Sequence, residues 1–256
     1  MKVISGVLGL MFKLYVGLLF LATLLLFYPF FLVVLSRQSW KRYSFPLNVA
    51  WSYTVRCLTF TRVVKIDFRH LPKGPYLIVS NHASYYDIFL MYSILPHHRF
   101  LFMGKSEILS YPLVNLFFKR LNIPVFRNDR LKAGRSFIKA RQEIQNGWSL
   151  VVFPEGGIPD GAPAMIPFKP GAFKLAKICK IPIVPMTFLD NYHLFSDPGE
   201  ILGPAHPGRS RVVFHPVIHP QEFAEWTDQQ LSDKVWSVIA APLIREGLMT
   251  ERNSAE

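Results

Sequence analysis

Two side chains with complementary chemistry, His82 and Asp87, follow the apolar run Tyr76–Val79 within a few residues. A histidine can take up a proton near neutral pH, and a carboxylate can orient its ring and stabilise the imidazolium that forms. On a regular helix these two positions would point about 140° apart, so a common helical face cannot join them. The pair can meet only if His82 lies in a turn and Asp87 in the first turn of the following helix.

This histidine–carboxylate pair is two-thirds of a Ser-His-Asp triad, and no serine stands at a fixed spacing from it. If a substrate supplied the missing hydroxyl, the histidine would act as a general base in acyl transfer. A structural interpretation is also open. Ser84, followed three residues later by Asp87 and then by Ile88–Met91, is a variant of the capping box that begins a helix. The two interpretations are compatible, because a helix cap can also place Asp87 beneath the imidazole.

A second apolar run, Val151–Phe153, also ends in a turn, Pro154-Glu155-Gly156-Gly157. Proline interrupts the hydrogen-bonded ladder of a strand, and glycines permit a positive φ or the close approach of a ligand. Glu155 would then lie at the edge of a sheet, beside exposed backbone N–H groups. Taken alone, such a turn is usually structural. After a strand, in a chain that carries the histidine–carboxylate pair, it becomes a candidate substrate-binding segment.

Four segments, in this order, resemble the glycerolipid acyltransferases, and among them the 1-acyl-glycerol-3-phosphate acyltransferase family. They are Asn81–Asp87, Ile123–Arg127, Phe153–Gly157 and Ile181–Pro185, with Phe168–Phe173 as a further match between the last two. The resemblance covers roughly residues 65 to 220. It implies that His82 and Asp87 are catalytic. It also implies an acceptor-binding set made of Lys105, Arg127, Glu155, Gly156 and Gly157.

The same resemblance implies the reaction. A fatty acyl chain would pass from acyl-CoA or acyl-carrier-protein to the free hydroxyl of 1-acyl-glycerol-3-phosphate (lysophosphatidate), making phosphatidate for phospholipid synthesis. No metal and no cofactor is expected, since the thioester is a co-substrate. Three departures from the family pattern concern the acceptor. Leu121 stands where the second segment usually has glycine, Phe126 where it has aspartate, and Gly157 where the third segment has threonine.

Three alternatives remain open at this point. An acyltransferase with another lyso-lipid acceptor is the nearest, and it rests on Leu121 and Phe126. A hydrolase would need its own nucleophile or metal, and neither Ser84 nor His97-His98 has supporting spacing. A non-catalytic membrane-binding module would retain an apolar anchor and a basic surface, but it has no need of the histidine–carboxylate pair.

The formal net charge of +12 calls for an anionic partner. Cations are dense between Lys105 and Arg141, but no recognition motif or interleaved stacking aromatics accompany them, so nucleic acid is not expected. Attraction to anionic lipid headgroups is the commoner cause in an anchored chain, and Lys105 with Arg127 could hold a phosphate on the acceptor. Cys57 and Cys179 lie far apart without metal-ligand spacing, so neither a disulfide nor a zinc site is expected.

The N-terminal region contains a long uncharged segment, Leu14–Ser36. A helix of this length covers about 34 Å, enough for a hydrocarbon core of about 30 Å. The segment exceeds the apolar part of a signal peptide and lacks the polar stripe of a soluble helix. If it spans, Arg37, Lys41 and Arg42 place its C-terminal flank in the cytoplasm. Alternatively, with a second helix in Tyr43–Cys57, it forms a re-entrant or in-plane pair of helices that anchors the domain on one side of the membrane, as the family resemblance implies. Either arrangement predicts membrane lipids as partners and a catalytic domain on the cytoplasmic face (the inner membrane in a bacterium).

The chain's 256 residues allow one sizeable domain in addition to this anchor. We expect a membrane anchor in residues 1–60 and a single acyltransferase domain in residues 61–250, of the α/β class, with a central mixed sheet flanked by helices. The expected strands are Val63–Phe68, Tyr76–Ser80, Trp148–Phe153, Ile181–Phe188 and Arg211–Ile218. The expected helices are Ser84–Leu95, Pro112–Leu121, Leu131–Gln145, Ala172–Lys180 and Thr227–Leu248. A capping box, Thr227 with Gln230, marks the start of the last helix.

Overall fold

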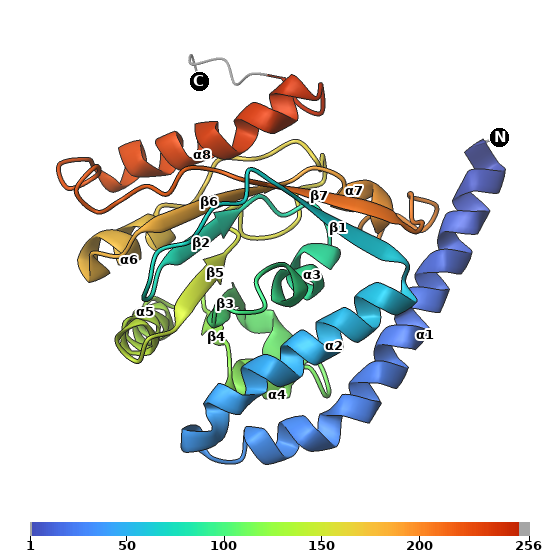
Figure 1. Cartoon of the computed structure of the whole chain (residues 1–256), viewed down its shortest axis with the longest axis horizontal. Helices are drawn as coiled ribbons and strands as arrows, with labels where there is room; N and C mark the ends of the chain where they lie inside the picture. The colour runs from blue at the N-terminus through green and yellow to red at the C-terminus, as the bar shows by residue number, and fades with distance from the viewer. Residues whose placement is uncertain (1, 251–256) are drawn as a thin grey trace. The chain divides into compact units, whose positions relative to one another are not determined.

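The computed structural model describes residues 2–250 (Figure 1). These residues form two compact units that interleave along the sequence. The first unit runs to Ile66 and includes Ala83–Arg99 and Phe188–Val212. The second unit contains Asp67–His82, Phe100–Thr187 and the chain from Val213 onward. The division between anchor and catalytic domain near residue 60 stays a prediction.

Parallel strands form the centre of the second unit. Their order is β6 (Ile183–Phe188), β2 (Leu77–Ser80), β5 (Ser149–Val152), β3 (Phe100–Lys105) and β4 (Ile123–Val125). Ile78 of β2 is in register with Val151 on one side and with Val184 on the other. All residues of β2, β5 and β6 are buried, and burial on both faces explains why these strands appear in the sequence as unbroken apolar runs.

Helices and one antiparallel pairing complete the second unit. Ile183 forms an antiparallel bridge with Ile218, so the strand pairing is mixed. α5 (Arg130–Gln145) packs on β4, β5 and α6 (Gly171–Cys179), and α6 contacts α8 (Asp228–Arg245). α4 (Asn115–Arg120) packs on β4 and on the 3-10 helix η2 (Ser106–Ser110). The predicted fold class, an α/β fold with a mixed central sheet flanked by helices, is confirmed.

The predicted capping box of the last helix is confirmed as well. The Thr227 side chain accepts the N–H of Gln230, and the Gln230 side chain accepts the N–H of Thr227.

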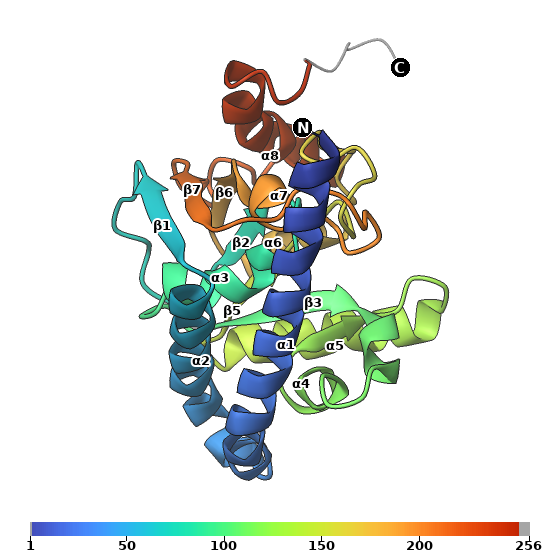
Figure 2. The ribbon, with the colours of Figure 1, turned by 90° about the vertical axis from the view of Figure 1, so that its right-hand side faces the viewer.

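The first unit is mainly helical. Its elements are α1 (Lys2–Val34), the 3-10 helix η1 (Gln38–Tyr43), α2 (Ser44–Leu58), β1 (Thr61–Ile66), α3 (Tyr86–Ile94), α7 (Asn191–Leu194) and most of β7 (Gly208–Phe214). α1 and α2 lie side by side in Figures 1 and 2. α2 also packs on α3, and α3 contacts β1 and α7. Trp51 of α2 stacks on Phe20 of α1 and donates its Nε1–H to Thr23 Oγ1 at 3.0 Å.

The predicted elements were wrong in two places that affect the site. They omitted β3 and β4, which the structure places beside β5. β4 has only three residues, one of them Pro124, so its strand conformation follows from pairing with β3 and has little local signature. Some ends also differ: β1 stops at Ile66, before Asp67 with a φ of 55°, and β7 stops at Phe214, before the expected Ile218.

Candidate active site

His82 lies two residues beyond the end of β2 and is buried. Its backbone N–H donates a 2.8 Å hydrogen bond to Glu155 Oε1. Its ring stacks on that of Phe153, with centroids 4.2 Å apart and 19° between the planes. The segment that follows β5 therefore fixes both the backbone and the imidazole of His82.

Glu155 is buried, and its carboxylate joins two loops of the second unit. Oε1 accepts the N–H of His82, and Oε2 accepts the N–H of Ile166 at 3.1 Å. From its place after an apolar run, Glu155 is expected at the edge of a sheet, beside exposed backbone N–H groups, where it shapes the acceptor pocket. The structure instead gives it the geometry of a support for the His82 turn, and direct contact with an acceptor stays a prediction.

Asp87 is fully buried in the first turn of α3, within the first unit. Its Oδ2 accepts the backbone N–H groups of Ala83 at 2.8 Å and of Ser84 at 2.9 Å. Its Oδ1 accepts a 2.7 Å hydrogen bond from Nδ2 of Asn191. The carboxylate thus closes the turn that begins with the residue directly after His82, while its predicted action on the imidazole stays a prediction.

The helix after His82 begins later than predicted, although the hydrogen bonds of the predicted cap are present. α3 begins at Tyr86 with Tyr85 as its N-cap residue, two residues later than expected. Ser84 Oγ nevertheless accepts the N–H of Tyr86 at 3.0 Å, and Asp87 accepts the N–H of Ser84 in return. The structural interpretation of this segment therefore describes part of the structure, because Ser84 and Asp87 supply the capping bonds, while the catalytic interpretation stays a prediction.

Three cations from different elements of the second unit surround the Gly156–Gly157 turn. Lys105 ends β3, Arg127 follows β4 and Lys169 precedes α6. Arg127 Nη2 donates to the carbonyl oxygen of Gly156. A Cβ added at Gly156 would lie 2.8 Å from Arg127 Nη2 and 3.0 Å from Lys169 Nζ, and one at Gly157 would lie 2.6 Å from Lys105 Nζ. We call these three side chains the cation cluster.

A Cβ at either position of this turn would require the flexible ends of these cations to move. Gly156 also has a φ of 87°, which favours glycine on backbone grounds. The charges act on one another: partial burial, then Arg127 and Lys105, lower the pKa of Lys169. The pKa of the Glu107 carboxyl is also lowered. The main cause is a hydrogen bond from the Glu107 backbone N–H, and the positive charges of Arg127 and Lys105 contribute less. A bound anion would relieve the repulsion among the three cations.

Lys105 and Arg127 are among the site residues predicted from the sequence, but Lys169 is not. The signal was present, because Lys169 belongs to the Phe168–Phe173 segment of the family resemblance. Its neighbours along the chain do not reveal its place beside Gly156, which follows from the loop between β5 and α6. There, the Lys169 N–H donates to the Pro154 carbonyl at 3.0 Å.

The order of the parallel strands explains how distant segments reach one site. β2 leads to His82, β5 to Glu155 and its glycines, β3 ends at Lys105 and β4 leads to Arg127. Parallel strands that neighbour one another present their carboxyl ends on one side, which is where open α/β sheets bind ligands. The two strands missing from the predicted elements are therefore the ones that carry Lys105 and Arg127 to this turn.

Metal-ligating side chains are not grouped in the part of the chain that the structure describes. Among residues 2–250, no three or more His, Cys, Asp or Glu side chains are placed to hold a metal ion together.

The Acyltransferase family model matches residues 62–189, half of the chain, and the chain belongs to this family. It is 36% identical to the 1-acyl-sn-glycerol-3-phosphate acyltransferase of Saccharomyces cerevisiae, over 58% of this chain and 52% of that protein. It is 26% identical to a probable 1-acyl-sn-glycerol-3-phosphate acyltransferase of Mycoplasma pneumoniae, over 86% of this chain and 90% of that protein. The predicted family resemblance is confirmed.

A solved structure shares the fold. The 1-acyl-sn-glycerophosphate (LPA) acyltransferase PlsC from Thermotoga maritima superposes with a TM-score of 0.73 at 23% identity, covering 98% of this chain and 100% of that chain. The chain spans about half the length of the first curated relatives that it matches, 45% and 54% of the proteins from Caenorhabditis elegans and Chlamydomonas reinhardtii.

Proposed function

We propose that the protein transfers a fatty acyl chain from an acyl thioester to the free hydroxyl of 1-acyl-glycerol-3-phosphate. The observation that carries this proposal is that His82 and the cation cluster lie at the carboxyl ends of adjacent parallel strands. His82 is buried there and is fixed by the hydrogen bond to Glu155 and by stacking on Phe153. A base for a hydroxyl and a cationic site for a phosphate match the two polar groups of this acceptor. The names of the relatives from yeast and Mycoplasma support the same acceptor.

In the proposed reaction, His82 takes the proton from the acceptor hydroxyl while that oxygen attacks the carbonyl carbon of the thioester. A C–O bond forms and gives a tetrahedral oxyanion, which backbone N–H groups or a nearby cation would stabilise. Collapse of the oxyanion breaks the C–S bond. The imidazolium then returns its proton to the leaving thiolate, so the products are phosphatidate and a free thiol. Asp87 would hold the imidazole in one tautomer throughout.

The acyl donor would be acyl-CoA or acyl-carrier-protein. An assay of the purified protein with a labelled acyl donor and a panel of lyso-lipid acceptors tests the proposal. Labelled phosphatidate formed from lysophosphatidate, in preference to lyso-lipids without a terminal phosphate, is the expected result. Equal use of the whole panel would contradict the proposed acceptor, and release of free fatty acid alone would indicate a hydrolase.

The departures from the family pattern do not favour a different acceptor. Leu121 is buried at the end of α4, where its N–H bonds to the carbonyl of Phe117, so it packs in the core. The ring of Phe126 faces the ammonium group of Lys132, 5.6 Å from the ring centroid. At the third departure, Gly157 provides the space that Lys105 occupies.

The cation cluster should set the affinity for the acceptor and leave the chemical step intact. We expect Arg127→Ala and Lys169→Ala each to raise the KM for lysophosphatidate about 10-fold, because each removes a charge-assisted contact from a partly exposed site. The KM for the thioester should change little. Steady-state kinetics with each substrate varied in turn measures both constants.

Lys174→Ala is the matched control, since Lys174 is an exposed lysine of α6 outside the cluster. A normal KM for lysophosphatidate in Arg127→Ala, together with a raised KM for the donor, would show that the cluster binds the donor. Raising the salt concentration should weaken acceptor binding less than binding to the membrane surface, because partly desolvated charges are screened less.

Membrane attachment through α1 and α2 belongs to the same proposal. Among the described residues, α1 is the one helix long and apolar enough to cross a membrane, and an 18-residue window within Ile4–Val34 has a mean hydropathy of 2.4. One of its faces packs against other parts of the first unit: Lys13 Nζ donates to Ser196 Oγ at 2.8 Å, and Phe31 is fully buried. The other face is apolar and exposed, as at Leu18 (70%) and Leu26 (64%). A spanning α1 would draw its packing partners into the hydrocarbon, so this geometry favours a helix lying in the interface.

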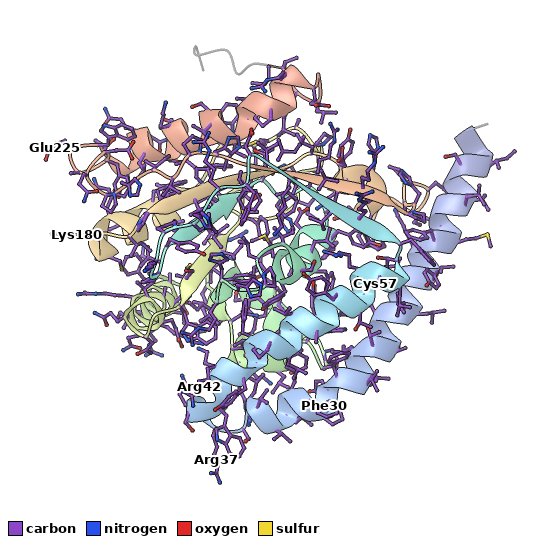
Figure 3. The ribbon with its side chains drawn as sticks, viewed as in Figure 1. Phe30, Arg37, Arg42, Cys57, Lys180 and Glu225 are labelled. Atoms are coloured by element: carbon purple, nitrogen blue, oxygen red, sulfur yellow. The ribbon has the colours of Figure 1, made fainter. Side chains whose placement is uncertain are left out.

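The turn after α1 carries groups suited to lipid headgroups. Figure 3 shows Arg37 and Arg42 at the end where α1 passes into η1 and α2. The guanidinium of Arg37 lies 4.9 Å from the ring centroid of Trp40, and that of Arg42 lies 4.9 Å from that of Tyr43. Aromatic rings and cations of this kind gather at membrane interfaces with anionic lipid. We therefore place the proposed anchor at the cytoplasmic surface.

Charging the exposed face of α1 should release the protein from membranes. We expect Leu18→Glu/Leu26→Glu to float poorly with vesicles of mixed neutral and anionic phospholipid, because two carboxylates would have to enter the apolar layer. Ile178→Glu, an equivalent change at an exposed position of α6, should float normally. Normal flotation of the double variant would contradict anchoring by this face.

Labelling can distinguish a spanning helix from an interfacial one. Single cysteines at Ser5 and Gln38, near the two ends of α1, would be introduced into a Cys57→Ser/Cys179→Ser background. With a membrane-impermeant maleimide on one side of sealed vesicles, an interfacial helix is labelled at both ends from the same side. A spanning helix is labelled at one end.

A further inference from the structure

Asn191 contacts the proposed catalytic carboxylate from a part of the chain outside the four family segments. It is the first residue of α7 and is fully buried. Its Nδ2 donates a 2.7 Å hydrogen bond to Oδ1 of Asp87, across 104 residues of sequence. Both residues belong to the first unit.

The oxygen atom of the Asn191 amide differs from the nitrogen atom in its hydrogen bonding. Within the described residues, Asn191 Oδ1 is buried without a hydrogen-bond partner. A buried polar atom in that state costs free energy, so the amide oxygen does not account for an asparagine at this position. The N–H group that Nδ2 donates to the buried Asp87 carboxylate does, because it supplies a partner to Oδ1 and fixes the direction of that bond. Rotating the amide would set an oxygen against the carboxylate, so Nδ2 must face Asp87.

The backbone that carries Asn191 is held on both sides. Before it, the Asp190 carboxylate pairs with Nη2 of Arg211 at 2.7 Å. After it, the Phe195 carbonyl accepts a 2.6 Å hydrogen bond from Ser84 Oγ, within the turn that Asp87 closes. The Phe195 ring also stacks on Tyr86, with centroids 5.1 Å apart. These contacts fix the backbone on both sides of Asn191, so its amide has a defined position relative to Asp87.

We infer that Asn191 is a positioning residue for the reaction, acting through Asp87. Two backbone N–H groups hold Oδ2, and the Asn191 amide holds Oδ1, so the carboxylate plane has one orientation. A base is efficient only when its orienting group is itself held in place. This inference rests on the proposed role of Asp87 in orienting His82.

Asn191→Leu tests the inference because leucine has a similar size and no donor. We expect kcat to fall about 10- to 100-fold, the effect of losing a hydrogen bond to a charged group. The KM values for both substrates should change little, since the cation cluster is untouched. A purely structural role would instead lower the fraction of folded protein without changing the kcat of the folded molecules.

A double-mutant cycle shows whether Asn191 acts through Asp87. Asp87→Asn alone should lower kcat strongly, and Asp87→Asn/Asn191→Leu should be no slower than Asp87→Asn, because the group that Asn191 positions has already been lost. If the fold-losses in kcat of the two single variants multiplied in the double variant, the inference would be overturned. Asn48→Leu is the matched control, since Asn48 is a buried asparagine of α2 whose Nδ2 bonds to the Ser44 carbonyl at 2.8 Å; it should retain kcat.

If Asn191→Leu does not fold, Asn191→Ser and Asn191→Ala form a smaller matched pair. Serine retains a donor, so its kcat should exceed that of the alanine variant several-fold, and equal kcat values would overturn the inference. Full activity of folded Asn191→Leu beside an inactive Asp87→Asn would overturn the inference alone. Full activity of Asp87→Asn would overturn the proposed role of Asp87 itself.

Discussion

Replacing His82 with alanine is expected to lower kcat by about 10²–10⁴-fold, the usual contribution of a general base. The variant should still bind membranes, because α1 and α2 are unchanged. It should also keep the turn after β2, since the hydrogen bond to Glu155 comes from the His82 backbone. A lower melting temperature is expected, because the ring that stacks on Phe153 is removed. Initial rates with a labelled thioester and lysophosphatidate, together with thermal melts, measure both effects.

His219→Ala serves as the control for this change, because His219 is an exposed histidine outside the site segments. It should retain wild-type turnover. Near-normal turnover of folded His82→Ala would exclude the proposed mechanism, whatever the acceptor.

Asp87→Asn should lose most of its activity, about 10²–10⁴-fold in kcat, and yet melt close to the wild-type temperature. The asparagine carbonyl can continue to accept the N–H groups of Ala83 and Ser84. Its NH2 group would face Asn191, whose amide can rotate to present Oδ1, which has no hydrogen-bond partner among residues 2–250 of the wild type. The loss of charge at the start of α3 costs about 0.3–1 kcal/mol of helix-dipole stabilisation.

A variant that loses activity but keeps its stability would separate the role of Asp87 in orienting His82 from its role in closing the turn before α3. Circular dichroism melts and steady-state kinetics on the same preparation provide the comparison. Reduced stability with unimpaired specific activity would show that Asp87 serves only to close the turn and begin the helix.

Much of the site could be predicted because its signals are local. An apolar run that ends in a turn is visible in the amino-acid sequence, so the segments around His82 and Glu155 could be placed at strand ends from the residues alone. The Thr227 capping box, predicted and then found, is local in the same way, since a cap depends on residues three apart. The family resemblance joined these segments because each motif is short and contiguous.

Tertiary structure decided what depends on contacts between distant segments. β5 lies between β2 and β3 in the strand order, and only this arrangement brings Lys105 and Arg127 to the glycine turn. The burial of Glu155 was decided in the same way, because its two backbone partners, at His82 and Ile166, come from separate loops.

Asn191 is the clearest case of a residue that the sequence could not reveal. Nothing in the residues around it distinguishes a buried amide from a surface one. Its partner Asp87 lies 104 positions away. A hydrogen bond between side chains requires that the fold place two atoms within about 3 Å of each other, and no local pattern of polarity encodes that distance. Local burial and turn chemistry thus determined which residues could react, and the packing of distant segments determined how they are held.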